Sequence, residues 1–117
     1  MDILTQQPDG ERRQVERKPL SVRVRMALQG KPEMEVRSVD ISVGGMSLTL
    51  DINLVPGTPC QLSFSMQLPN GDIHKIQAEA AVAHCTYSSK RSGFVTGVQF
   101  KRISSDAQAL VARYMKG

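Results

Sequence analysis

Apolar and polar residues alternate with a period of two along most of the chain, which is the pattern of strands that bury one face. The alternation occurs in six short segments, which are residues 20–28, 34–40, 46–50, 60–68, 73–82 and 94–100. Six short strands exceed what one flat sheet of this length usually holds, and closing the sheet into a barrel removes its vulnerable edges. The pattern therefore predicts an all-β fold, a six-stranded antiparallel β-barrel.

Turn residues separate the predicted strands. Residues 69–72 contain the pair Asn70-Gly71, which is favoured in tight hairpin turns, so the strand at 73–82 should run back antiparallel beside the strand at 60–68. Residues 29–32 and 88–93 are also polar and contain glycine, and we interpret them as further turns.

The period changes near the C-terminus, where apolar side chains recur at helical spacing and predict one α-helix over about residues 105–116. Ser105 and Gln108 fit a capping box, and Asp106 lies where the helix dipole favours a negative charge. We expect the apolar stripe to pack across the open end of the barrel, although a partner-binding helix has the same pattern. The stripe consists of Ala107, Leu110, Val111, Tyr114 and Met115.

Composition favours one domain with an aliphatic core. The chain has 117 residues, of which 40% are hydrophobic but only 4% aromatic, and it has no Trp. Residues 1–10 show no sustained pattern, so we expect a flexible tail there and a folded domain over residues 11–117. The sequence contains neither an apolar run long enough to span a membrane nor a signal peptide. We expect a cytoplasmic protein without direct membrane insertion.

The reactive side chains do not form a catalytic or metal-binding pattern. Cys60 and Cys85 are far apart and lack metal-ligand spacing, and Cys60 is interpreted as a small buried hydrophobic residue. His74 and His84 each stand alone in strand-like segments and are interpreted as structural. No nucleophile and base, paired carboxylates or phosphate-binding loop before a helix can be assembled. We expect no enzymatic activity, no cofactor and no metal.

Positive charge is concentrated in a basic arm, residues 11–18, which contains Arg12, Arg13 and Arg17. The whole chain carries a formal charge of +4, a mild excess that favours anionic partners. Pro19 disfavours helical geometry at the preceding residue, so the arm should lead into an extended segment. We expect a flexible clamp that becomes ordered when it binds an anion. The alternative is a solvated charged segment or a general polyanion contact.

The segment from Asp40 to Gly45 is a polar turn between two predicted strands. Its composition also fits an ordinary turn, because Asp and Ser bond their own backbone and Gly is conformationally permissive. Beside the arginine arm, however, it would complete a site for an anionic guanine nucleotide. Arginine binds phosphate oxygens and guanine O6 and N7, while Asp40 can accept from the opposite guanine edge. Ser42 can bond phosphate, and Gly44 and Gly45 let a ligand approach the backbone.

Two motifs in this order resemble the PilZ domain family. Residues 13–17 fit RxxxR, and residues 40–45 fit (D/N)xSxxG. The end of the chain, with residues 97–100 followed by Ile103 and a short helix, is also similar to the end of that family. The likeness covers about residues 11–116. It implies a six-stranded β-barrel that binds the bacterial second messenger cyclic di-GMP and does no catalysis of its own.

The resemblance also implies a role for each motif residue. Arg13 and Arg17 would contact phosphates and guanine Hoogsteen edges, while Asp40, Ser42 and Gly45 would hold the other guanine edge and the ligand backbone. An arginine in the place of Arg12 accompanies two stacked ligand molecules in this family, because a cation there can lie on a guanine face. We therefore expect two ligands per chain.

Three functions remain open from the sequence. The first is a cyclic di-GMP receptor that reorders its basic arm and presents an altered face to an unidentified protein effector. The second is a degenerate family member that acts as a ligand-independent adaptor in motility, pilus or polysaccharide systems. The third is a barrel that binds single-stranded nucleic acid, which we do not expect because few aromatic residues are present to stack bases.

Overall fold

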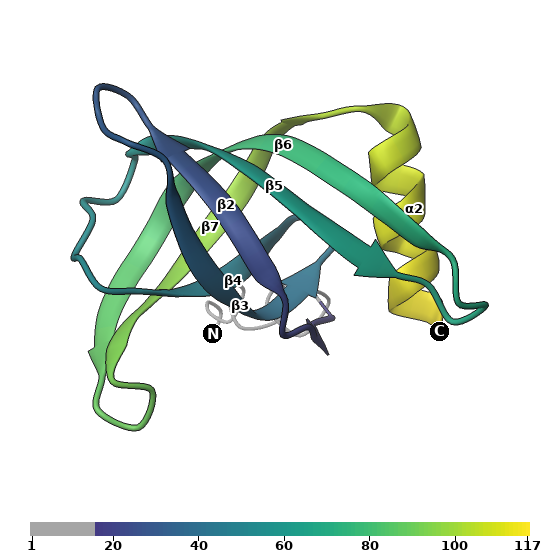
Figure 1. Ribbon diagram of the computed structural model, residues 1–117, viewed down its shortest axis with the longest axis horizontal. Helices are drawn as coiled ribbons and strands as arrows, with labels where there is room; N and C mark the ends of the chain where they lie inside the picture. The colour runs from purple at the N-terminus through teal and green to yellow at the C-terminus, as the bar shows by residue number, and fades with distance from the viewer. Residues whose placement is uncertain (1–15) are drawn as a thin grey trace, which may run out of the picture.

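The computed structural model describes residues 16–117, which form seven strands and one helix (Figure 1). In chain order these are β1 (Lys18–Pro19), β2 (Arg23–Leu28), β3 (Met34–Ser42), β4 (Gly45–Leu50), β5 (Pro59–Gln67), β6 (Ile73–Ser88), β7 (Gly93–Ile103) and α2 (Ser105–Lys116). The predicted flexible tail, residues 1–10, lies outside the described residues, and so do Arg12 and Arg13 of the basic arm.

The strands form one antiparallel sheet in the order β1-β3-β2-β5-β6-β7-β4. An additional pairing of β3 with β4 joins the two sides, so that β2 to β7 make a closed barrel (Figure 1). The hairpin predicted at Asn70-Gly71 is present, with Gln67 paired to Ile73 and a φ of 95° at Gly71. The predicted six-stranded antiparallel β-barrel with one C-terminal helix is confirmed.

β1 is an extra, two-residue strand that the alternation does not predict. It lies along the same edge of β3 as β2, because Pro19 pairs with Asp40 and Arg23 pairs with Arg37. The Ser38 hydroxyl bridges the interval between the two strands, since it donates to the carbonyl of Leu20 and accepts from the N–H of Val22. This bridge positions the end of the basic arm beside the polar turn.

The strand predicted from Leu20 begins at Arg23 as β2, and three strands extend beyond their predicted C-terminal ends. β3 continues to Ser42 instead of ending at Asp40, β6 continues from the predicted end at Val82 to Ser88, and β7 continues past Phe100 to Ile103. In the extension of β6 most side chains are exposed or half-buried, so apolar alternation disappears there. Backbone pairing with β7 nevertheless continues to the last residue, where Ser88 faces Gly93.

The barrel interior is aliphatic, as the composition predicts. Its largest fully buried side chains include Met26, Leu48, Met66 and Ile76, which come from four different strands. Alternate residues of β5 point inward, as its alternating burial pattern shows. The inward-facing side chains of the closed sheet thus form one continuous core.

Helix α2 packs its predicted stripe against the barrel. Ala107 and Val111 are buried, and the other members of the stripe, Leu110, Tyr114 and Met115, are partly buried against the core. The predicted capping box is wrong by one position, because Ser104 is the N-cap and its hydroxyl accepts from the N–H of Ala107 at 3.1 Å. No helix within residues 16–117 has the length and apolar character that a membrane crossing requires.

Cys60 should react with thiol reagents much more slowly than Cys85 in the folded protein. Cys60 is 4% exposed, and burial raises its pKa from 9.0 to about 11, so the nucleophilic thiolate is scarce. Burial of the neutral Cys60 thiol favours the folded state fully below pH 9, and this contribution to stability is lost as the pH rises toward about 11. An aromatic disulfide reagent at pH 8 should show one fast and one slow thiol, and equal rates in the folded protein would refute this prediction.

Candidate functional site

The polar turn forms the tip of the β3–β4 hairpin. Ser42 pairs with Gly45 across the hairpin, so only Val43 and Gly44 lie outside the strands. The Ser42 hydroxyl is buried, accepts from the N–H of Gly44 and donates to the carbonyl of Gly45, both at 3.3 Å. In this arrangement the Ser42 hydroxyl stabilises the turn. To bind phosphate, as predicted, the hydroxyl would have to give up its hydrogen bond to the carbonyl of Gly45.

The two glycines of the turn, Gly44 and Gly45, have different surroundings. A Cβ on Gly45 would lie 2.0 Å from the carbonyl oxygen of Val98, so only glycine lets β4 approach β7 at this point. A Cβ on Gly44 would meet nothing within 4 Å. Gly44 instead accepts a hydrogen bond from the N–H of Phe100 at 2.9 Å, which fixes the turn against β7. Of the two, Gly44 is the residue that leaves space for a ligand beside the backbone.

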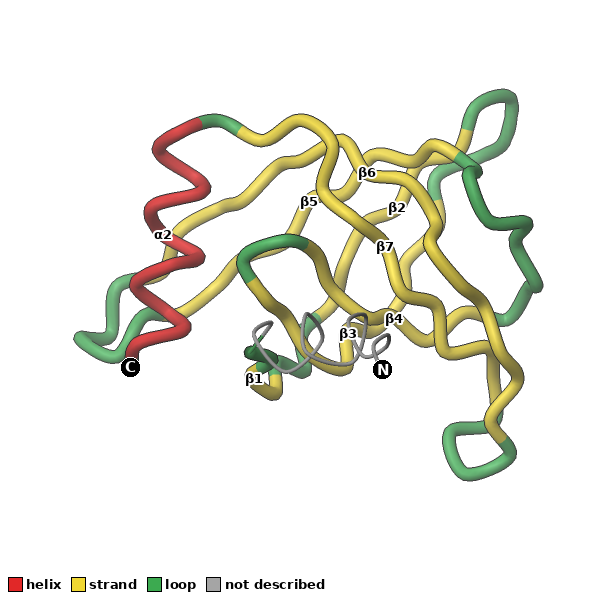
Figure 2. Tube along the Cα trace, turned by 180° about the vertical axis from the view of Figure 1, so that it is seen from behind, coloured by secondary structure: helices red, strands yellow, loops and turns green. Residues whose placement is uncertain are grey.

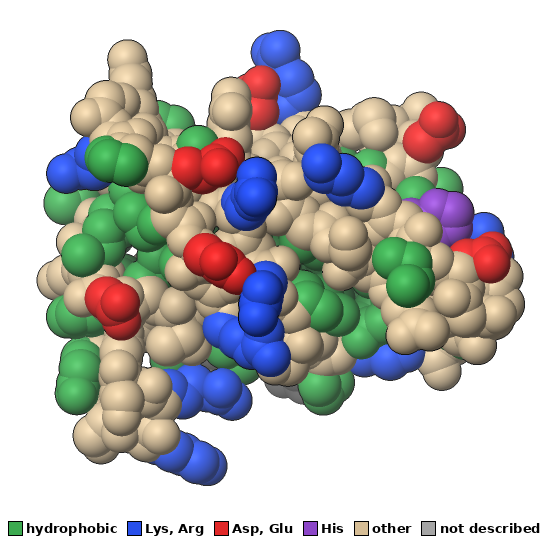
Figure 3. Space-filling model, viewed as in Figure 1, with side chains coloured by type: hydrophobic (Ala, Val, Ile, Leu, Met, Phe, Trp, Pro, Cys, Tyr) green, Lys and Arg blue, Asp and Glu red, His purple; other side chains and the backbone are tan. Residues whose placement is uncertain are grey.

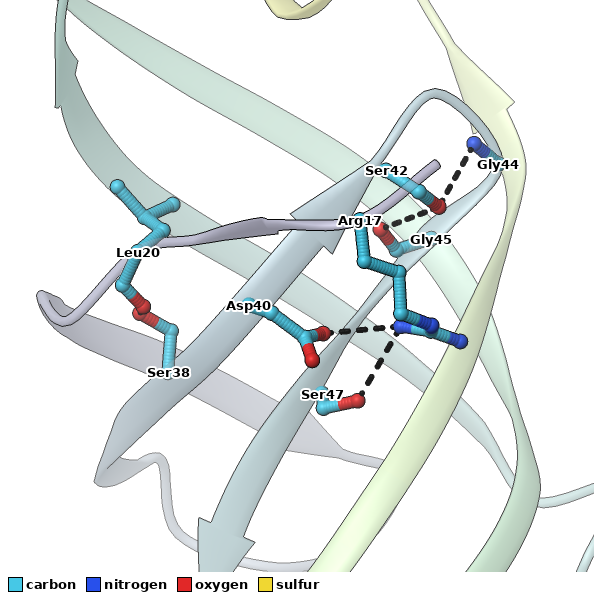
Figure 4. A network of polar contacts seen from close by, with 8 residues as sticks. All are labelled: Arg17, Leu20, Ser38, Asp40, Ser42, Gly44, Gly45 and Ser47. Atoms are coloured by element: carbon cyan, nitrogen blue, oxygen red, sulfur yellow. Dashed lines mark hydrogen bonds and ion pairs between the residues drawn. The ribbon is translucent and has the colours of Figure 1, made fainter. Parts of the chain in front are cut away.

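Arg17 joins the basic arm to the polar turn (Figure 4). Its Nη1 donates to Asp40 Oδ1 at 2.9 Å and to Ser47 Oγ at 3.4 Å. The Arg17 and Asp40 side chains are 46% and 25% exposed, so the ion pair contributes little to stability and can exchange with other partners. Of the three predicted arginines, Arg17 is the one whose contacts with the turn are described.

Four paired residues form a row on the outer face of the barrel, which begins at Asp40 on β3 and continues over β4, β7 and β6. Asp40 pairs with Ser47, Ser47 pairs with Gly97, and Gly97 pairs with His84, so these residues share the outer face of the sheet. The His84 ring fills the space over Gly97, because a Cβ there would lie 2.3 Å from Nε2. Sequence reasoning missed Ser47 and interpreted His84 as structural, since only the strand register brings both residues into line with Asp40.

The outer face formed by β2, β5 and β6 has a different electrostatic character. Figure 3 shows positive and negative side chains intermingled on this face. Arg23 pairs with Glu35 at 3.3 Å, and a hollow of about 380 Å³ is lined by residues of both signs, among them Arg25, Glu33 and Glu79. A groove for single-stranded nucleic acid requires excess positive charge with aromatic platforms, and this mixed face does not fit that description. Within residues 16–117, no three His, Cys, Asp or Glu side chains gather as a possible metal site.

Several solved structures share this fold. The Bacillus subtilis inhibitor of motility, MotI/DgrA, has a TM-score of 0.72 and 22% identity, over 88% of this chain and 49% of that protein. The PilZ domain of YcgR from Escherichia coli, solved with c-di-GMP, has a TM-score of 0.67 and 19% identity, over 90% of this chain and 89% of that domain. The Borreliella burgdorferi PlzA protein in complex with c-di-GMP has a TM-score of 0.58 and 16% identity, over 94% of this chain and 45% of PlzA.

The matched region therefore spans about half of MotI/DgrA and of PlzA, and at these identities the likeness establishes the fold. A search of curated proteins gave no match. The family model for the PilZ domain, in contrast, matches residues 11–117, a range that includes both the RxxxR and the (D/N)xSxxG segments. With its six-stranded barrel, its arginine at the polar turn and this match over nearly its whole length, the chain belongs to the PilZ domain family.

Proposed function

We propose that this chain is a receptor domain for cyclic di-GMP, with no catalytic activity, and that it binds the ligand between the basic arm and the β3–β4 hairpin. The observation that carries the proposal is the 2.9 Å contact between Arg17 and Asp40, which brings the two motifs of the family together. Two solved relatives of the same fold, YcgR and PlzA, contain c-di-GMP.

Arg17 and Asp40 have complementary chemistry for a guanine nucleotide. The guanidinium of Arg17 presents donors that fit phosphate oxygens or guanine O6 and N7. The carboxylate of Asp40 accepts from the N–H groups on the opposite edge of guanine. Since the ion pair is partly exposed, Arg17 and Asp40 can separate and bind the ligand at a small cost in free energy.

The remaining motif residues complete the proposed site. Arg13 would act with Arg17 on phosphate and guanine, and Arg12 would lie on a guanine face of a second, stacked ligand molecule. Both arginines lie outside the described residues. Gly44 supplies an open backbone, while Ser42 and Gly45 keep the hairpin in the shape that the ligand requires.

Binding would order the arm and present an altered face to a protein effector in the cytoplasm. The solved relatives include an inhibitor of motility and a PilZ domain from a cellulose-synthesising bacterium. We therefore propose that the effector belongs to a motility or exopolysaccharide system. The competing proposal is a ligand-independent adaptor, in which the Arg17–Asp40 ion pair has only a structural role.

Mapping amide chemical shifts by NMR would distinguish these two roles. Adding cyclic di-GMP to the full chain should shift the amides of Arg17, residues 40–47 and Gly97, while the amide of Gly30, in the distant β2–β3 turn, should not shift. GTP and cyclic GMP serve as controls, because they offer guanine without the cyclic dinucleotide arrangement. If the ligand leaves the 40–47 amides unchanged, this site is not where cyclic di-GMP binds.

A further inference from the structure

Strand β1 lies between the β3–β4 hairpin and the last turn of α2 (Figure 2). On the helix side, Lys18 Nζ donates to the carbonyl of Tyr114 at 2.9 Å and lies 4.4 Å from the centroid of the Tyr114 ring. The Tyr114 hydroxyl in turn donates to the carbonyl of Pro19 at 2.7 Å. These three contacts are called the β1–α2 latch below.

On the opposite side, β1 is in register with the polar turn. Lys18 pairs with Ile41 and Pro19 pairs with Asp40. Two residues can form few ladder hydrogen bonds, and proline has no N–H to donate. The backbone pairing of β1 is therefore weak. Its C-terminal end is fixed by the buried Leu20, whose N–H donates to the carbonyl of Val39 at 3.1 Å, and the position of Lys18 and Pro19 depends further on Arg17 at one side and on Tyr114 at the other.

The latch also contributes to holding the last turn of α2. The buried residues of the helix, Ala107 and Val111, lie in its first two turns, whereas Tyr114 and Met115 in the last turn are only partly buried. The carbonyl of Tyr114 accepts from the N–H of Gly117 at 3.2 Å and, more closely, from the Lys18 ammonium at 2.9 Å, where a positive charge also suits the negative end of the helix dipole. The Tyr114 hydroxyl is protonated at neutral pH and can donate, and burial raises its pKa further.

We propose that the β1–α2 latch transmits ligand binding from Arg17 and Asp40 to the last turn of α2, which becomes the surface that changes in the ligand-bound protein. This inference rests on the proposed binding of cyclic di-GMP. When Arg17 leaves Asp40 to bind the ligand, the adjacent Lys18 and Pro19 move with it. Hydrogen bonds of 2.7 to 2.9 Å tolerate little displacement, so the latch opens and the last turn loosens.

The coupling must act in both directions. If the ligand weakens the latch, removing the latch strengthens ligand binding by the same factor. Tyr114→Phe deletes the bond to Pro19 and keeps the ring, and one hydrogen bond of this kind corresponds to about a fivefold gain in affinity. Lys18→Met removes the other bond and the cation over the ring, and should act in the same direction.

Hydrogen exchange of the full chain, read together with calorimetry, tests this coupling. Saturating cyclic di-GMP should accelerate exchange of the amides at residues 112–117. Tyr114→Phe and Lys18→Met should show that fast exchange without ligand and should bind the ligand more tightly. Tyr87→Phe is the matched control, since Tyr87 is 59% exposed on the distant β6–β7 hairpin and should change neither measurement.

The outcomes separate the two proposals. Saturable binding of cyclic di-GMP with unchanged exchange at residues 112–117 would overturn the latch and leave the proposed function intact. Saturable binding with unchanged affinity in both latch variants would overturn it as well. The absence of any binding by the unmodified chain would overturn the proposed function, and the coupling with it.

Discussion

Arg17→Ala should weaken the binding of cyclic di-GMP by about a hundredfold. The variant removes the guanidinium that reaches Asp40 at 2.9 Å and Ser47 at 3.4 Å, and with it the donors proposed for phosphate and guanine. Because the Arg17–Asp40 pair is partly exposed, the stability of the barrel should change little. The dissociation constant and the unfolding midpoint, measured on the same preparation, separate loss of binding from loss of folding.

Arg25→Ala is the matched control for this variant. Arg25 lies on β2, where its side chain is 73% exposed and pairs with Glu33 at 3.8 Å. Removing it subtracts the same charge from the protein without touching the β3–β4 hairpin. If both variants lost affinity equally, binding would depend on total charge, and the specific role of Arg17 would be refuted.

Gly45→Ala should destabilise the protein by about 3 kcal/mol. Its Cβ would lie 2.0 Å from the carbonyl oxygen of Val98 and 3.2 Å from Cα of Gln99, so the new methyl group meets the backbone of β7. A backbone in the middle of a paired strand cannot rotate away as a side chain can. The pairing of β4 with β7 must therefore loosen where Gly45 faces Gln99. Chemical denaturation would measure the loss.

Gly44→Ala provides the internal comparison, because a Cβ at this neighbouring position has nothing within 4 Å. It should leave the unfolding free energy close to that of the unmodified protein, within about 0.5 kcal/mol. Equal destabilisation by the two substitutions would show that the turn needs glycine for backbone conformation, and that the close approach to Val98 is not the cause.

The barrel could be predicted from the sequence because its strands have one buried and one exposed face. In β5 every second side chain, beginning with Cys60, lies in the core, so the pattern of apolar residues identifies the strand directly. The end of β6 has no such contrast between its faces, and its length follows from pairing with β7. β1 escaped prediction because its residues, Lys18 and Pro19, are poor strand formers held by neighbours far along the chain.

The proximity of arm and turn was predicted from chemistry and from the PilZ resemblance, and Arg17 and Asp40 do meet. Ser47 and His84 could not be assigned to the same region, because that requires the register of four strands in a closed sheet. The same limit applies to Tyr114, whose apolar spacing predicted packing on the barrel but gave no indication of its bonds to β1. The spacing of apolar residues identifies the strands and the helix, whereas the contacts between them depend on how the sheet closes.

Calorimetric titration of the full chain with cyclic di-GMP tests the central claim most directly. We predict saturable heat in the micromolar range, with two ligands per chain if Arg12 stacks on a second molecule. GTP and cyclic GMP should give no comparable heat under the same conditions. If cyclic di-GMP gives no heat at high micromolar concentration, the chain is not a receptor for this ligand, and the adaptor role would replace the proposed function.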